Sequence, residues 1–434
     1  MSIFTLSDAH SQTLEEALTA AYLSNPTLQA QRAAVRATDE LVPQALGGWR
    51  PTVALQSSIQ TSDIDSSASD GSLTGTSSAL ILEQNLYQGG ETTANVARAE
   101  RLVRLERARL MATEQDVLFS AVEAYTGLLT DLAVLELAKQ NEARLGRQLE
   151  AVRDRFNVGE VTRTDVAQAE ARLAGAVAER TAAEGAIETS KATYRNIIDQ
   201  EPVSLSPPPV LQQIPGDEAT AQGLAEGINP NTLAAEYNLA AAEEDVRVAT
   251  SALLPSLDLE GALRYDDDPN LAIDWQREAT IGLQLRVPLY QGGGEYAGVR
   301  QAKQIVDQRR NDLETVARSV REETTTAWQA LVTARSRIKS IRAQVEAAEI
   351  ALEGSQREAE VGQRTTLDVL DQENDLFQAG VDLVQAQRDE IVASYRLKAA
   401  VGQLTAPELS LPVDVYDADA HYQAARNRLF GLGR

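Results

Sequence analysis

The chain has 434 residues, no cysteine, two histidines and a formal net charge of −24. The lack of cysteine excludes a disulfide framework, a cysteine-ligated zinc site and a cysteine nucleophile. His10 and His421 lie near opposite ends of the sequence, which argues against histidine-based catalysis or metal binding. We therefore expect no enzymatic activity, no metal site and no cofactor. The negative charge also predicts no nucleic-acid partner, because phosphates would be repelled.

Residues 1–11 have neither the basic start nor the apolar centre of a signal peptide. No apolar run approaches the ~20 residues of a membrane-spanning helix. The sequence is therefore expected to be either cytosolic or the mature form of an exported protein whose signal was removed.

The sequence is an internal duplication, because short motifs recur at a nearly constant offset of 201 to 204 residues. We predict a first repeat over 12–204, a linker over 205–217, a second repeat over 218–406 and an irregular C-terminal tail over 407–434. The recurring motifs are Asn25-Pro26 and Asn229-Pro230, Leu86-Tyr87-Gln88-Gly89-Gly90 and Leu289-Tyr290-Gln291-Gly292-Gly293, Val158-Gly159-Glu160-Val161-Thr162 and Val361-Gly362-Gln363-Arg364-Thr365, and Ala192-Thr193-Tyr194-Arg195 and Ala393-Ser394-Tyr395-Arg396.

Each repeat is predicted to open with a short helix and a longer one, over about 13–46 and 218–254. Each Asn-Pro pair marks the start of the longer helix, with proline in the first turn. A pair of strands follows in each repeat, because apolar and polar residues alternate over about ten residues. The predicted strands cover about 51–61, 77–87, 256–265 and 280–288, and they are joined by polar loops over 62–76 and 266–279.

A long antiparallel helical hairpin completes each repeat, over about 91–200 and 295–402. Apolar residues recur there at steps of three and four, as in a coiled coil. These residues are Leu118, Val122, Tyr125, Leu129 and Leu132 in the first hairpin and Ile338, Ile341, Val345, Ala348 and Leu352 in the second. At 1.5 Å per residue, the longer arm of the second hairpin would measure about 100 Å, which is too tall for a compact globule.

Both strand pairs begin and end on helices, so all helices are predicted on one side of a membrane. A strand pair alone cannot sit in lipid, because its edge N–H and C=O groups would lack partners. Four strands are too few to close a barrel, so several chains must combine, and three chains would supply about twelve strands. Trp49, Tyr87 and Tyr290 lie at strand ends, where an aromatic belt is expected.

Two repeats of this kind, with their Leu-Tyr-Gln-Gly-Gly motifs and Val-Gly-x-x-Thr turns, resemble the TolC family of outer-membrane channel-tunnels of Gram-negative bacteria. The resemblance implies a mainly α fold with membrane β: a homotrimer whose β-barrel lies in outer-membrane lipid and is continued by an α-helical barrel in the periplasm. It also implies a periplasmic adaptor protein and an inner-membrane transporter of the ABC or RND type as partners. The implied functions are type I protein secretion and multidrug efflux.

The second hairpin turn is expected to carry an electrostatic site. Asp368 and Asp371 are three residues apart and share one helix face. Threefold symmetry would turn an inward-facing pair into a carboxylate ring that excludes anions and binds polyvalent cations, and in which neighbouring charges raise each other's pKa. By resemblance, the matching aspartates of the family line the tunnel entrance. The alternative is a solvated carboxylate pair, which is usual in so acidic a chain.

The resemblance gives Arg364 the role of a latch, which bonds to Thr164-Asp165 at the neighbouring hairpin turn and holds the entrance shut. A tyrosine that assists in the best-known member falls at Ala359 here, so this latch is expected to have fewer bonds. The alternative for Arg364 is a solvated turn residue.

By the same resemblance, the two turns are the tips on which an adaptor docks. The matching residues are Val158, Gly159, Thr162, Val361, Gly362 and Thr365. The alternative is that glycine in each turn simply allows a positive φ at a helix end.

Two other classes of protein were compared with this pattern. A soluble coiled-coil scaffold would explain the helices and the charge, but not four alternating strands ahead of glycine pairs. A periplasmic adaptor would have one long hairpin rather than two in register.

Overall fold

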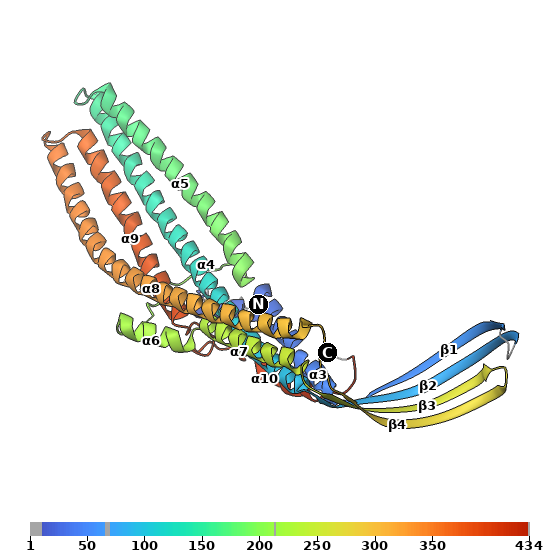
Figure 1. Cartoon of the computed structure of the whole chain (residues 1–434). Helices are drawn as coiled ribbons and strands as arrows, with labels where there is room; N and C mark the ends of the chain where they lie inside the picture. The colour runs from blue at the N-terminus through green and yellow to red at the C-terminus, as the bar shows by residue number, and fades with distance from the viewer. Residues whose placement is uncertain (1–10, 66–69, 212–213, 433–434) are drawn as a thin grey trace, which may run out of the picture. The chain divides into compact units, whose positions relative to one another are not determined.

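The computed structural model describes residues 11–65, 70–211 and 214–432. The chain is mainly helical, with one four-stranded antiparallel sheet, and the predicted combination of long helices and strands is confirmed (Figure 1). It forms two compact units. The hairpin unit comprises the described residues up to Gln31 together with Leu110–Thr232 and Ala317–Tyr416. The sheet unit comprises Arg32–Arg109, Leu233–Val316 and the described part of Asp417–Arg434.

Two long helical hairpins dominate the hairpin unit (Figure 1). The first is formed by α4 (Glu91–Asn157) and α5 (Arg163–Ile198), and the second by α8 (Gly294–Glu360) and α9 (Thr366–Ala400). Helices α4 and α8 have 67 residues each and contribute residues to both units. The predicted apolar spacing packs one arm on the other, since Ile338 and Ile341 of α8 form a buried cluster with Ala386 of α9.

Both hairpin turns are built in the same way. Gly159 and Gly362 have φ of 83° and 77°, which a residue with a side chain rarely adopts. Around Gly159, the N–H of Glu160 donates to the carbonyl of Arg155 at 2.9 Å and the N–H of Gly159 donates to the carbonyl of Phe156 at 3.0 Å. This is the glycine-ended helix terminus known as a Schellman motif. The positive φ at each helix end therefore explains why both turns contain glycine.

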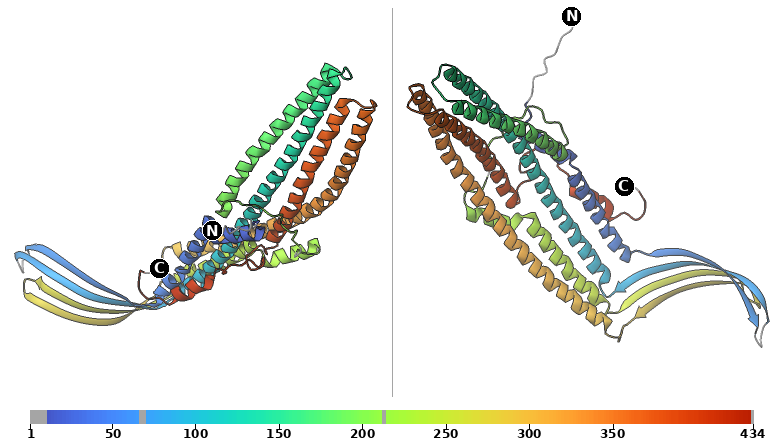
Figure 2. Two further views of the ribbon diagram at one scale, coloured as in Figure 1. Left: turned by 180° about the vertical axis from the view of Figure 1, so that it is seen from behind. Right: turned by 90° about the horizontal axis from the view of Figure 1, so that it is seen from above.

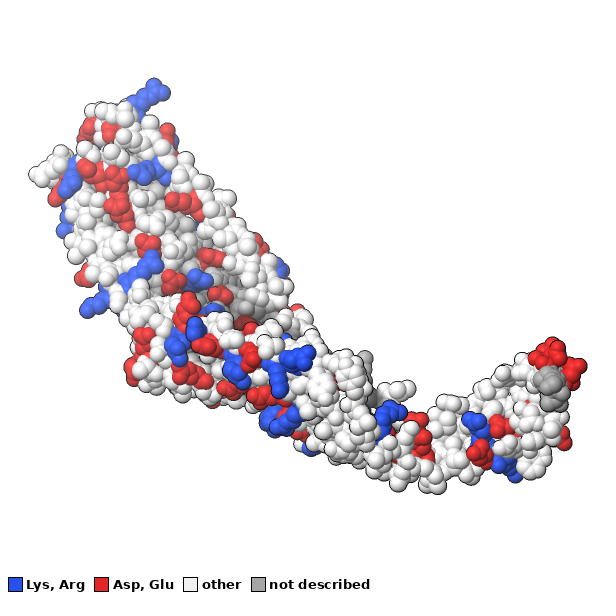
Figure 3. All heavy atoms as spheres, viewed as in Figure 1, with Lys and Arg blue, Asp and Glu red and all other residues white. Residues whose placement is uncertain are grey.

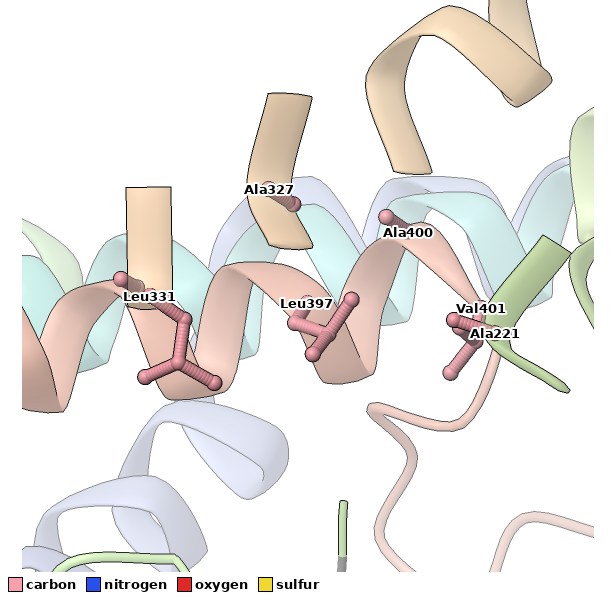
Figure 4. Close-up of a cluster of buried hydrophobic side chains, with 7 residues drawn as sticks. Ala221, Ala327, Leu331, Leu397, Ala400 and Val401 are labelled. Atoms are coloured by element: carbon pink, nitrogen blue, oxygen red, sulfur yellow. The ribbon is translucent and has the colours of Figure 1, made fainter. Parts of the chain in front are cut away.

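The base of the hairpin unit contains α1 (Leu14–Ser24) and α6 (Glu218–Ile228), one from each repeat. Helix α6 joins α8 and α9 through a buried cluster (Figure 4), formed by Ala221, Ala327, Leu331, Ala393, Leu397, Ala400 and Val401. The Asn-Pro motifs tie both repeats to this base. The side-chain amide of Asn25 donates to the carbonyl of Ile197 at 3.0 Å, and that of Asn229 donates to the carbonyl of Ala400 at 2.9 Å.

The sheet unit contains the strands β1 (Thr52–Asp65), β2 (Asp70–Gln88), β3 (Ser256–Asn270) and β4 (Ile273–Arg286). They lie side by side in the order β1-β2-β3-β4, all antiparallel (Figure 2). The two predicted strand pairs are thus one sheet, joined where β2 of the first repeat pairs with β3 of the second. The short helices α3 (Leu41–Leu46) and η1 (Gly47–Trp49) precede β1, and α2 (Pro26–Asp39) and α7 (Pro230–Ser251) add residues to this unit.

The strands are longer than predicted, and the predicted polar loops 62–76 and 266–279 are mostly strand. Residues 66–69 of the first loop lie outside the described residues. Hydroxyl pairs continue the first ladder where apolar alternation stops: Ser57 faces Ser78 and Thr61 faces Thr74, each with 3.0 Å between the oxygens. Cross-strand Ser and Thr pairs stabilise a sheet without apolar residues. The prediction relied on apolar alternation, so it ended these strands too early.

Two helix predictions were also wrong. The longer of the two helices expected over 13–46 is interrupted between α2 and α3, because Pro43 lacks an N–H and its ring would clash with the carbonyl of Asp39. The tail expected to be irregular contains α10 (Ala418–Arg426). Asp417 caps this helix, and Tyr422 packs against a buried cluster that contains Val42 and Val103.

Helix α4 contains an 18-residue stretch with a mean hydropathy of 1.4 and at most two charged residues. By length and composition alone, this stretch could cross a membrane, which the sequence analysis had not anticipated. Buried core helices have the same composition, and 44% of the stretch is buried inside the chain. Leu118, Val122 and Tyr125 of α4 are fully buried, as expected of a core helix.

Candidate functional site

The register of the sheet puts the apolar residues of all four strands on one face. Val53 lies opposite Leu82, Leu80 opposite Leu263, and Leu259 opposite Leu283, and directly opposed residues point to the same side. This face carries Val53, Leu55, Ile59, Leu80, Leu82, Leu257, Leu259, Leu263, Ile281, Leu283 and Leu285. Most of these side chains are exposed, with Ile281 at 82% and Leu283 at 66%. A contiguous exposed apolar surface of this kind needs a partner other than water.

The opposite face of the sheet is polar. It carries Gln56, Ser58, Gln60, Glu83, Asp258, Glu260, Arg264, Glu278 and Gln284. An apolar face backed by a polar face is the pattern of a strand that separates lipid from water. Acidic side chains gather at the end of the sheet away from Gly89-Gly90 (Figure 3), where Asp70, Asp266, Asp267 and Asp268 lie.

Exposed aromatic residues flank the apolar band. Tyr87 and Tyr290 lie at its helix-proximal end, as predicted, and both are exposed. Tyr265 and Trp275 lie at its other end, with the guanidinium carbon of Arg277 at 5.6 and 5.4 Å from their ring centroids. Leu257 of β3 lies opposite Tyr87, and the eight residue steps from Leu257 to Tyr265 span about 26 Å. This is close to the ~25 Å band between the aromatic girdles of membrane barrels. This second girdle was not among the features predicted from the sequence.

Both edges of the sheet are open. Among the described strands, β1 and β4 each have one neighbour, and each edge is 14 residues long. Their unpaired backbone groups could not remain in lipid without partners. In lipid, these two edges would therefore require further strands as partners.

At the hairpin turns, Asp165 and Asp368 are the third residues of capping boxes whose N-cap residues are Thr162 and Thr365. Asp165 and Asp368 each accept hydrogen bonds from the N–H and the hydroxyl of the threonine three residues earlier, Thr162 and Thr365, at 2.7 to 2.9 Å. These bonds hold the pKa of both carboxyls below the usual range. In a single chain, the pKa of Asp368 is thus lowered, whereas neighbouring carboxylates in a ring are expected to raise it. The capping bonds stabilise the folded chain at pH values above the unfolded carboxyl pKa of about 4. This contribution is lost as the pH falls through the lowered pKa of the folded chain.

Asp371 has a different partner from Asp368. Its carboxylate oxygen Oδ1 lies 2.5 Å from Nη2 of Arg172, which belongs to α5 in the other hairpin. The predicted aspartate pair is therefore not one free carboxylate cluster in a single chain, because Asp368 belongs to a capping box and Asp371 is in an ion pair.

The latch predicted for Arg364 is not formed inside the chain. Its Nε donates to Oε2 of Glu358 at 2.9 Å, within its own hairpin, while Asp165 is bound to its own cap residue. Thr164 lies exposed in the first turn of α5. Ala359 is buried between the arms of the second hairpin, in a cluster with Leu352 and Val369.

The two tips expose an apolar residue each. Val158 is 71% exposed and Val361 is 70% exposed, and the neighbouring glycines and cap threonines are exposed as well. Two exposed valines at the ends of long hairpins are available to a partner protein.

A buried polar network between the hairpins was missed by the sequence analysis. Glu373 of α9 is 3% exposed and accepts from Nε of Arg144 on α4 at 2.8 Å and from Nε2 of Gln356 on α8 at 3.2 Å. Its position was a usable signal, since Leu370, Glu373 and Phe377 follow the spacing of the apolar seam. A carboxylate in a seam requires a buried partner.

Glu373→Ala should loosen the contact between the two hairpins, because it leaves the guanidinium of Arg144 in a mostly buried site without its partner. We expect a cost of about 2–4 kcal/mol, somewhat below that of breaking a fully buried pair because Arg144 is partly exposed. Faster amide hydrogen exchange in α9 would measure it. Asp375→Ala, an exposed carboxylate on the same helix, is the control, and equal exchange in the two variants would contradict the network.

Comparison with known proteins agrees with these features. The family model for outer membrane efflux proteins matches residues 17–198 and 223–403. The chain belongs to the outer membrane efflux protein family. It is 37% identical over 432 residues to the outer membrane efflux protein BepC of Brucella suis biovar 1, which covers 99% of this chain and 94% of that protein. It is 28% identical over 436 residues to the outer membrane protein TolC of Vibrio cholerae, with 97% of each chain covered.

The fold of this efflux protein is also that of solved channels. The Campylobacter jejuni CmeC outer membrane channel superposes with a TM-score of 0.83 at 16% identity, over 95% of this chain and 89% of that one. The predicted TolC family and outer-membrane location are confirmed, and the efflux protein is a channel rather than an enzyme. The soluble scaffold and the periplasmic adaptor are thereby excluded.

Proposed function

We propose that this efflux channel is a homotrimer that forms the exit duct of a tripartite export system, for type I protein secretion, multidrug efflux or both. The duct is a passive conduit, gated at its periplasmic end. One observation supports this most strongly: a sheet with one exposed apolar face and two open edges continues into two long helical hairpins.

Closure of the barrel follows from the strand order. Each chain contributes an even number of antiparallel strands, so β4 of one copy runs opposite to β1 of the next copy. The two edges have the same length and can pair without breaking the antiparallel order. Three copies would give about twelve strands, within the range of outer-membrane barrels. The polar face would then line a water-filled lumen and the apolar face would contact lipid.

The partners proposed for the periplasmic end are an adaptor protein and an inner-membrane transporter of the ABC or RND type. The exposed tips around Val158 and Val361 are the proposed docking points for the adaptor. No chemical step is assigned to the channel, which supplies a path and an electrostatic filter.

The trimer and the conduit can be tested together. Detergent-extracted protein should have a protein mass of three times 46.9 kDa in native mass spectrometry, and it should conduct ions in a planar bilayer. A monomer or dimer that conducts would overturn the trimer alone, whereas a trimer without conductance would overturn the conduit.

Replacing Asp368 with Asn, which keeps an acceptor for the capping bonds from Thr365, and Asp371 with Ala should weaken cation selectivity and abolish block by polyvalent cations. The carboxylates concentrate cations at the mouth, and their removal lowers the local cation concentration. Reversal potentials in a salt gradient and block by a trivalent cation measure the two effects. Asp375→Ala serves as a control for loss of an exposed carboxylate on the same helix. Unchanged readings in the double variant would mean that the aspartates do not line the pore.

A further inference from the structure

The starting observation is the ion pair between Arg172 and Asp371. Arg172 is on α5 of the first hairpin and Asp371 is on α9 of the second, with 2.5 Å between Nη2 and Oδ1. Both side chains are about half exposed, at 41% and 47%. The pair is thus reachable by ions in solution, and its strength is expected to be modest and to fall with salt.

The surrounding contacts fix this pair in place. Leu370, the residue before Asp371, is fully buried in a cluster with Leu149 of α4 and Ala176 of α5. Two residues further along α9, Glu373 binds Arg144 of α4. The backbone of α9 is therefore held against the first hairpin on both sides of Asp371. Arg172 faces a carboxylate whose position is set by packing rather than by their attraction.

The duplication does not repeat this arrangement. At the offset of 203 residues, the position equivalent to Arg172 is Asp375, and the position equivalent to Asp371 is Gln168. Arg172 thus supplies a cation to the second hairpin, and the second hairpin has an aspartate rather than a cation at the equivalent position. The other aspartate of the proposed ring, Asp368, is held by Thr365 of its own hairpin.

We propose that Arg172 is a specificity-determining residue, which neutralises Asp371 while the two hairpins are in contact and exposes its charge when they separate. This rests on the proposed carboxylate ring at the mouth. With the hairpins packed, Asp371 is in an ion pair, and Asp368 is the member of the ring that has none among the described residues. When α9 moves away from α5, Asp371 adds its charge to the ring. Cation selectivity therefore rises as the mouth opens, and the same movement controls both.

The test uses the full-length channel in a planar bilayer. Arg172→Gln should shift the reversal potential in a potassium chloride gradient towards that of a cation-selective pore. It should also lower the lanthanum(III) concentration for half-block by roughly tenfold, since a focused field raises local cation concentration by at least this factor. While the hairpins are packed, the charge-exchanged double variant Arg172→Asp with Asp371→Arg should keep the parent's selectivity, because the pair is still neutral.

Arg153→Gln is the matched control. Arg153 lies near the same end of the first hairpin and forms a half-exposed ion pair of 2.7 Å, but with Glu170 of its own hairpin. It should leave both readings at the parent's values. An equal effect of Arg153→Gln would reduce the finding to general charge and overturn the proposal.

The remaining outcomes separate this proposal from the ring on which it rests. If Arg172→Gln changes nothing while Asp368→Asn with Asp371→Ala weakens selectivity, the ring stands and the role of Arg172 is refuted. If Arg172→Gln raises conductance with selectivity unchanged, Arg172 is only a structural tie and the proposal fails. If neither the arginine nor the aspartate variants change selectivity, the ring itself fails.

Discussion

Leu283→Arg should strongly reduce assembly of the channel in the outer membrane, whereas Gln284→Arg should be tolerated. Leu283 is opposite Leu259 on the apolar face of the sheet, and Gln284 is opposite Asp258 on the polar face. An arginine near the bilayer midplane on the lipid side costs roughly 2–4 kcal/mol in each copy. In a trimer this cost applies three times. The yield of folded oligomer in outer-membrane fractions measures the effect.

The two positions are adjacent, so the pair controls for local strand propensity and for the added charge. Arginine at Leu259 or Leu285 should act like arginine at Leu283. If Leu283→Arg and Gln284→Arg assembled equally well, the apolar face would not contact lipid, although the family assignment would be unaffected.

The repeated architecture could be predicted from sequence because its determinants are local. Spacing of three and four residues along α8 placed Ile338 and Ile341 correctly against α9. Gly159 and Gly362 were correctly associated with helix ends, because only glycine adopts their positive φ without strain. The strand alternation likewise assigned the apolar residues that share one face of the sheet.

The strand ends and α10 could not be predicted by the same means. Hydroxyl pairs such as Thr61 with Thr74 stabilise the ladder only after the register is known, and each strand alone reads as a polar loop. Helix α10 is short and polar, and it is held by tertiary contacts. Asp419 pairs with Arg107 at 2.6 Å and His421 with Asp39 at 2.9 Å, residues more than 300 positions away in sequence.

At the candidate site, too, local sequence patterns predicted the local contacts but not those between distant residues. The capping roles of Thr162 and Thr365 follow from the sequence spacing of a capping box. The arginine partners of Asp371 and Glu373 are on the other hairpin, about 200 residues earlier, and no local pattern indicates them. A resemblance to a family does not supply them either, because it carries over only residues that match the family's motifs.

The proposed gate is a bond between Arg364 and Thr164-Asp165 of a neighbouring hairpin. Arg364→Ser and Asp165→Asn should each raise single-channel conductance, and the double variant should add little beyond either. Asparagine is preferred to alanine at Asp165 because Oδ2 of Asp165 also caps α5, and alanine would remove the cap together with the charge. A guanidinium-carboxylate pair is directional, so it can fix one hairpin against another.

The pairing of Arg364 inside the chain sharpens this test. To reach Asp165, Arg364 must leave Glu358, which it contacts at 2.9 Å. Glu358→Gln should therefore release Arg364 to the latch and lower the conductance, which is opposite to the effect of Arg364→Ser. Arg357→Ser, which removes an exposed arginine paired with Glu353 of the same helix, is the control.

With Ala359 buried and no tyrosine there, the latch has fewer bonds, so the parent channel is expected to open more readily than relatives that have the tyrosine. If conductance is unchanged in Arg364→Ser, Asp165→Asn and Glu358→Gln alike, the latch is refuted. The contact of α9 with the first hairpin through Glu373 and Arg144 then becomes the element that must break when the channel opens.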